Sequence, residues 1–169
     1  MVNDILKYGV AWLLMVFFQV FLFNYLTLFQ VAIPFVFILH LFLLPVGLPK
    51  YFLYPLAFLT GLLVDVFSEN MATGLHAFST LLAVGARDYW LNYIRPTNLR
   101  NASDIDLRGQ GIIWLISYLF PLILVHHLAY FLLEAMSFSN FLLTIGKVLA
   151  SSLYSFVLMI LITYVFYKR

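Results

Sequence analysis

Apolar segments separated by short polar turns fill most of this chain, and they restrict its fold more than any other feature. Six segments can be delimited, at residues 8–23, 33–44, 51–67, 73–93, 112–133 and 141–167. A helix needs about 20 apolar residues to cross a bilayer, with a range of roughly 17–25. The sequence therefore predicts an all-α integral membrane protein in which residues 1–169 form one domain, a six-transmembrane-helix bundle. Segment 33–44 is short and bracketed by Pro34 and Pro45, so we expect a tilted or partly embedded helix there.

The composition agrees with a membrane protein and excludes several other classes. Hydrophobic residues make up 64% of the chain and charged residues only 9%, whereas soluble globular domains contain about 25% charged residues. The net charge of +2 is small and dispersed, so it indicates no nucleic-acid surface. The chain has no cysteine, which excludes disulfides, thiolate metal sites and thiol nucleophiles.

The basic residues predict how the bundle is oriented. If the N-terminus is cytoplasmic, the inner side holds Lys7, Lys50, Arg95, Arg100, Arg108, Lys168 and Arg169. The outer turns at 24–32, 68–72 and 134–140 hold none, and only Lys147 lies toward the outer side. Because cytoplasmic loops of membrane proteins are enriched in Lys and Arg, we expect both termini in the cytoplasm. Loop 95–110 is either a solvated connector anchored to anionic lipid headgroups or a docking surface for a cytoplasmic partner.

Polar residues within the predicted spans gather at one level, the outer third of the bundle. Asp65, His76, His126, His127 and Lys147 lie at or near this depth. An unpaired charge costs roughly 2.5–3.5 kcal/mol inside a bilayer, so Asp65 and Lys147 are a candidate ion pair. Two alternatives stay open: Lys147 extends its ammonium group to the outer interface, and Asp65 is hydrogen-bonded to Ser68 or Asn70.

The histidines do not have the spacing of a metal site. His126 and His127 are adjacent, so they point about 100° apart on a helix, and no carboxylate lies four residues from either. A proton relay through His76 and Asp65 is a further alternative. The chain also lacks G-x-S-x-G, H-E-x-x-H and phosphate-loop motifs. We therefore expect a protein that is not an enzyme and holds no metal or cofactor.

Segment 141–167 carries a polar face formed by Lys147, Ser151, Tyr154 and Ser155. Small residues and hydroxyl groups let membrane helices approach closely and hydrogen-bond across the contact. This face packs either inside the same bundle or against the helix of another protein. Gln19, in the first segment, is a similar candidate for a hydrogen bond between helices.

The hairpin over residues 60–78 joins two predicted spans and carries the most specific pattern. Gly61 and Gly74 stand where the two helices meet, and Thr73 is a candidate N-cap. The run G-L-L-V-D ends at Asp65, T-G-L-H-A follows at residues 73–77, and I-P-F-V-F-I-L-H-L-F-L-L-P precedes both. Together with the chain length and the six predicted spans, these runs resemble the rod shape-determining protein MreD family.

The resemblance implies a non-enzymatic scaffold subunit in the cytoplasmic membrane of a bacterium. It implies binding to MreC, and through MreC to MreB, the glycosyltransferase RodA and the elongation transpeptidase, in support of lateral peptidoglycan synthesis and rod shape. Membrane lipid surrounds such a protein, and self-association stays open. The residues expected to bind a partner or to support the bundle are Gly61, Asp65, Gly74, His76, Lys147, Ser151 and Ser155.

A second hypothesis comes from the same resemblance, because the MreD family is similar in fold to the substrate-binding subunits of energy-coupling-factor transporters. A small-molecule (vitamin) carrier of that kind needs an outward-facing pocket with several polar groups. Asp65, His76 and Lys147 lie at the required depth. Such a subunit also needs a cytoplasmic-side helix face with small residues for its coupling partner, and the sequence shows no clear face of this kind.

Overall fold

A computed structural model of the chain describes residues 2–68, 73–94, 111–136 and 140–166. The helices, in chain order, are α1 (Val2–Phe21), the 3-10 helix η1 (Phe23–Tyr25), α2 (Ile38–Leu43), α3 (Lys50–Phe67), α4 (Leu75–Ile94), α5 (Gly111–Ala135) and α6 (Phe141–Phe166). Within these residues the only β pairing is an isolated bridge between Leu28 and Ala32. The prediction of an all-α chain is confirmed for this part of the sequence.

Four of the described helices are long and apolar enough to cross a membrane. Their qualifying stretches are Tyr8–Tyr25, Lys50–Phe67, Ile113–Ala135 and Phe141–Val165. The length and composition of these helices therefore mark the chain as a membrane protein. The six spans predicted from the sequence are supported for four helices only. The helix α4 has 20 residues but is less apolar, because it carries Arg87 and Asp88 among other polar residues, and α2 has only six residues.

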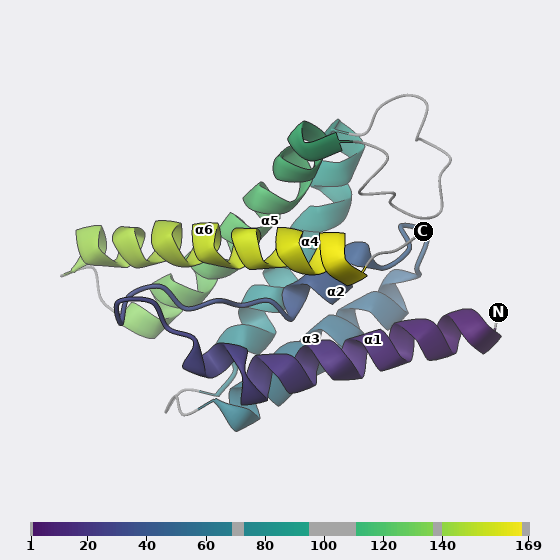
Figure 1. Ribbon diagram of the computed structural model, residues 1–169, viewed down its shortest axis with the longest axis horizontal. Helices are drawn as coiled ribbons and strands as arrows, with labels where there is room; N and C mark the ends of the chain where they lie inside the picture. The colour runs from purple at the N-terminus through teal and green to yellow at the C-terminus, as the bar shows by residue number, and fades with distance from the viewer. Residues whose placement is uncertain (1, 69–72, 95–110, 137–139, 167–169) are drawn as a thin grey trace.

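The helices from α3 to α6 pack in chain order, and α1 lies beside α3. The indole N–H of Trp12 in α1 donates to the hydroxyl oxygen of Thr60 in α3, over 2.8 Å. Figure 1 shows α1 and α6 on opposite sides of the chain that leads into α2, and it shows the start of α1 and the end of α6 at the same end of the molecule.

The predicted helix at 33–44 is wrong for the first part of that segment. Helical structure is confined to Ile38–Leu43, and residues 33–36 have no regular structure. Pro34 contributes to this difference, because proline disfavours a helical conformation at the residue before it and has no N–H of its own. Residues 35–42 are nevertheless enclosed, with at most 5% of any side chain exposed. Non-helical backbone at membrane depth is tolerated where protein surrounds it.

Two hydroxyl groups of α6 bind the backbone of this non-helical stretch. The Ile33 N–H donates to Ser151 Oγ over 3.0 Å, and the Phe35 N–H donates to Ser155 Oγ over 2.9 Å. Both serines are fully buried. The polar face predicted on the last segment is therefore used inside the bundle at these two positions, where it replaces the hydrogen bonds that a helix would have made.

Gln19 of α1 holds the same stretch from the opposite side. Its side-chain oxygen accepts from the Val36 N–H over 2.7 Å and from the Phe37 N–H over 3.2 Å. Its side-chain amide nitrogen donates to the Pro34 carbonyl over 2.9 Å. The sequence identified Gln19 as an interhelical hydrogen-bonding residue, and the structure gives it an extended backbone as partner.

The carbonyl end of α2 is bound by buried groups of α4 and α5. Arg87 donates to the Leu44 carbonyl and, from Nε, to the Tyr118 hydroxyl over 3.3 Å. The Tyr118 hydroxyl in turn donates to the Phe42 carbonyl over 2.7 Å. Arg87 is fully buried. Groups from α1, α4, α5 and α6 thus fix α2 and the stretch before it.

Candidate functional site

The α3–α4 hairpin closes through a glycine that allows the two backbones to touch. A Cβ atom added at Gly61 would lie 2.5 Å from the Ala77 Cα and 2.6 Å from the Ala77 nitrogen. Real Cβ atoms are not found at such distances from backbone, so any side chain at Gly61 would force the helices apart. The close approach predicted at Gly61 is therefore present. Gly74 has a φ of +105°, a conformation that favours glycine and turns the chain into α4.

Asp65 lies one turn after Gly61 and caps the N-terminus of α4 from the neighbouring helix. Its Oδ1 accepts from the His76 N–H over 2.9 Å, and its Oδ2 accepts from the Ala77 N–H over 3.0 Å. These N–H groups are among the first four of a helix, which have no partner within it. The residue before α4 is Gly74, which has no side chain to act as a cap. Asp65 therefore supplies the cap that the sequence assigned to Thr73, and its charge is favourable at a helix N-terminus.

The candidate ion pair between Asp65 and Lys147 is not formed. The carboxylate of Asp65 is bound by backbone N–H groups, while the exposed Lys147 lines a separate pocket of about 350 Å³ together with Glu134. The alternative in which the Lys147 side chain reaches the membrane surface agrees with this exposure. The predicted bond from Asp65 to the Ser68 side chain is also wrong, because that hydroxyl donates to the Val64 carbonyl over 2.7 Å. Asn70 lies outside the described residues.

A cluster of aromatic rings and histidines surrounds Phe35 at the same end of the bundle. The Phe35 ring centre lies 4.6 Å from that of His76, 4.9 Å from that of His127 and 4.8 Å from that of Tyr130. The rings of His76 and His126 stack with centres 6.0 Å apart. Within the described residues, no group of three His, Cys, Asp or Glu side chains is arranged to hold a metal ion.

The hydrogen bonds of His127 define its protonation pattern. Its Nδ1 lies 2.8 Å from the Ile123 carbonyl, and its Nε2 lies 3.0 Å from Ser155 Oγ. A carbonyl only accepts, so Nδ1 carries the proton, and Nε2 of the neutral ring accepts from the Ser155 hydroxyl. His127 therefore orients Ser155 toward the backbone of Phe35. The proton relay considered for His76 and Asp65 is not formed, because Asp65 contacts the backbone N–H of His76 rather than its ring.

A pocket of about 180 Å³ opens beside this cluster and beside the α3–α4 turn. It is lined by Asn24, Tyr25, Ile33, Phe35, Phe67, Ser68, His76 and Tyr130. Of the five residues that the sequence placed at this level, only His76 lines the pocket. His76 is 1% exposed, and its Nδ1 is a buried atom with no hydrogen-bond partner within the described part of the chain.

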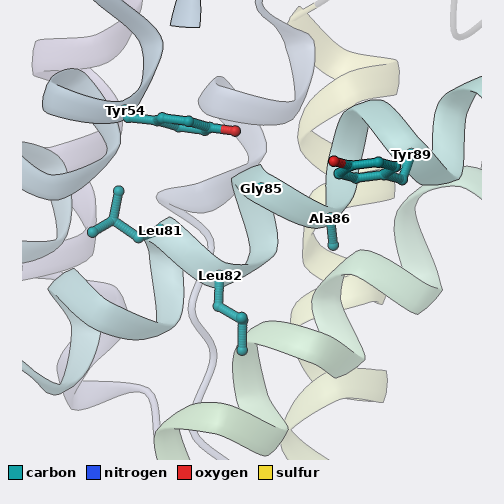
Figure 2. A pocket seen from close by; sticks show the side chains of 6 residues that line it. All are labelled: Tyr54, Leu81, Leu82, Gly85, Ala86 and Tyr89. Carbon is teal, nitrogen blue, oxygen red and sulfur yellow. The ribbon is translucent and has the colours of Figure 1, made fainter. Parts of the chain in front are cut away.

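A larger groove of about 540 Å³ lies on the outside of the α3–α4 pair, toward the C-terminal end of α4. Figure 2 shows Tyr54 and Tyr89 on either side of Gly85, with their hydroxyl groups pointing toward each other. A Cβ atom at Gly85 would have no neighbour within 4 Å. This groove was not predicted from the sequence. Its signal was Gly85 inside a predicted span, because a small residue lets another membrane helix approach closely.

Comparisons of this chain with protein-family models, with curated proteins and with solved structures find no match. A functional assignment therefore depends on the geometry of the hairpin, the pocket and the groove.

Proposed function

We propose that this protein is a non-enzymatic membrane scaffold of the bacterial cell-elongation machinery, which binds MreC. The observation that carries the proposal is the junction between α3 and α4. The two runs that resemble the MreD family contribute Gly61 and Asp65 from one helix, and His76 and Ala77 from the other. Residues that form the resemblance in sequence thus contact one another as one structural unit.

The proposed topology has six passages through the cytoplasmic membrane and both termini in the cytoplasm. Residues 28–43 supply the second passage as an extended stretch followed by α2, which runs between α1 and α6 (Figure 1). The start of α1 and the end of α6 lie at the same end of the molecule (Figure 1), as an even number of passages requires. The distribution of Lys and Arg supports a cytoplasmic location for that end.

The groove at Gly85 is the place where the single membrane helix of MreC would dock. Phe78, Leu82, Gly85 and Tyr89 follow one another at intervals of four, three and four residues, the spacing of a helix-contact stripe. The side chains of Phe78, Leu82 and Tyr89 are 53%, 47% and 77% exposed. Glycine inside a helix costs about 1 kcal/mol relative to alanine, and no packing within the described chain uses this one. A partner side chain inserted at Gly85 would use the gap.

Through MreC, the scaffold would hold MreB, RodA and the elongation transpeptidase at one membrane site. MreC is the occupant that the resemblance favours for the groove. A second copy of this chain is the competing occupant, since self-association stays open.

The test is co-purification with MreC from mildly solubilised membranes, using wild-type protein, Gly85→Leu and Gly146→Leu. Gly146 lies within α6 and, like Gly85, has no neighbour within 4 Å of an added Cβ, so Gly146→Leu is a control on another helix. We expect Gly85→Leu to weaken MreC binding by about tenfold or more, equivalent to about 1.4 kcal/mol, with no change for Gly146→Leu.

Two results would contradict different parts of the proposal. If wild-type protein and MreC, each folded, do not associate, the scaffold function is wrong. If Gly85→Leu retains MreC as well as wild type, the groove is not the docking surface and another face holds MreC. Loss of self-association alone in Gly85→Leu would assign the groove to a second copy.

A further inference from the structure

The pocket beside His76 combines features that membrane-protein surfaces facing lipid do not need. Five of its eight lining residues carry a polar side-chain group: Asn24, Tyr25, Ser68, His76 and Tyr130. The remaining three are Ile33, Phe35 and Phe67. An acyl chain gains nothing from hydroxyl, amide and imidazole groups, since it cannot hydrogen-bond to them. The lining therefore favours a polar occupant.

His76 is the residue that points to a ligand. Its ring is held in place on both sides, stacked on Tyr130 with ring centres 4.3 Å apart and edge-on to Phe35 at 4.6 Å. It is almost fully buried, yet its Nδ1 has no partner within the described residues. Buried polar atoms are usually hydrogen-bonded, and each exception requires an explanation. An occupant of the adjoining pocket would supply the missing partner after a small movement of the ring.

The charge and size of the pocket restrict this occupant. None of the eight lining residues is Asp, Glu, Lys or Arg. Within the described residues, the two nearby carboxylates are already engaged, that of Asp65 by two backbone N–H groups and that of Glu134 by the Tyr130 side chain. The described part of the pocket therefore offers a charged ligand no free counter-ion, so an uncharged ligand is favoured. A cavity of about 150 Å³ accommodates one benzene ring, so the pocket volume of about 180 Å³ fits a single substituted ring.

We propose that this pocket binds a small uncharged molecule with one heteroaromatic ring that carries both a hydrogen-bond donor and an acceptor. The ring would pack against the aromatic side chains of the pocket, and its polar edge would pair with His76 and the neighbouring hydroxyl groups. This inference does not depend on the proposed scaffold function. Of the three residues named for the carrier hypothesis, only His76 lines this pocket.

The experiment measures thermal stabilisation of the purified full-length protein in detergent by nicotinamide and by uracil at millimolar concentration. A ligand that binds only the folded state raises the melting temperature, and the stabilisation grows with the logarithm of the ligand concentration once that concentration exceeds Kd. Toluene tests whether any ring suffices, and riboflavin tests whether a larger vitamin fits. We expect at least one of the two polar single-ring probes to stabilise the protein, with no stabilisation by toluene or riboflavin.

The variant His76→Phe assigns any binding to this pocket. It retains a ring against Tyr130 and the backbone N–H that binds Asp65, but its slightly larger ring carries no nitrogen atoms. We expect its affinity for the stabilising probe to fall by about tenfold or more. If His76→Phe does not fold, Tyr25→Leu is the second variant, because Tyr25 is exposed on the pocket wall. Lys147→Gln, in the neighbouring pocket, is the control that should bind as wild type does.

The proposal is overturned if neither polar probe shifts the melting temperature, which would leave the pocket to water. It is also overturned if toluene or riboflavin stabilises the protein equally, or if the His76 and Tyr25 variants that fold bind as well as wild type. Failure of MreC binding in the separate co-purification has no bearing on these results.

Discussion

The helices α3 and α4 each contain one glycine, and the two glycines have different surroundings. Gly61 lies in a contact that holds the fold together, whereas Gly85 lies on a surface that is open to a partner. Gly61 of α3 faces α4 so closely that an added Cβ would lie 2.5 Å from the backbone of Ala77. Gly85 of α4 faces outward, and an added Cβ would meet nothing within 4 Å. One glycine is required by the chain itself, whereas the other leaves a gap beside Tyr54 and Tyr89 (Figure 2).

The polar groups near the two glycines differ in the same way. Beside Gly61, both oxygens of Asp65 are used to cap α4, so the junction is complete within the chain. Beside Gly85, the tyrosine side chains flank an open groove. An internally satisfied junction is expected to respond to mutation through stability, and an open groove through binding.

The largest effect should be the difference in folding stability between two separate variants, Gly61→Leu and Gly85→Leu. Gly61→Leu forces α3 and α4 apart, and because the obstruction is backbone rather than a flexible side chain, we expect a loss of more than about 3 kcal/mol of folding stability. Gly85→Leu should leave stability unchanged or slightly higher, since leucine is the better helix former. The stability of each variant is measured by its melting temperature and by the yield of monodisperse protein in detergent. If the two variants were equally stable, the distinction between a structural contact at Gly61 and an open groove at Gly85 would be wrong.

An intermediate effect is expected at Asp65. Asp65→Leu leaves the N–H groups of His76 and Ala77 without an acceptor, and at about 1–3 kcal/mol for each buried unpaired group we expect a loss of roughly 2–6 kcal/mol. Asp65→Asn keeps one oxygen and should cost about half as much. Reversible unfolding in mixed detergent micelles gives both values. Equal and severe losses for the two variants would mean that the negative charge itself, rather than the hydrogen bonds, is what the junction needs.

The smallest effect is expected at Lys147. This residue is exposed and lies in a different pocket from Asp65, so Lys147→Gln should change stability by no more than about 0.5 kcal/mol. In the double variant with Asp65→Asn, the two changes should be additive within about 0.5 kcal/mol. The same unfolding assay applies. A strong coupling between the two substitutions would support the ion pair between Asp65 and Lys147. It would contradict a junction in which Asp65 is bound by backbone N–H groups alone.

Much of the hairpin could be predicted from sequence, whereas the path of residues 28–37 could not. The spacing of Gly61 and Asp65 near a helix end, followed by Gly74, indicated two helices in close contact. By contrast, Ile33 and Phe35 lie in an apolar run that predicts a helix by composition. Pro34 gives a local reason against a helix, but the backbone partners that stabilise the non-helical path include serines of α6 more than a hundred residues later. Local propensity cannot register a hydrogen-bonding partner so distant in the chain.

The amino-acid sequence was enough to establish the membrane class, the helical nature of the chain and the polar residues that the bundle uses, because a bilayer admits few ways to satisfy a backbone. The partner that each polar residue takes is set by the packing of the folded chain. Asp65 binds the N-terminus of α4 instead of Lys147, Gln19 and Ser155 bind backbone instead of another helix, and His76 lines a pocket. The physical reason is that depth in the membrane follows from position along a helix, whereas hydrogen bonding depends on distances of about 3 Å that packing alone sets.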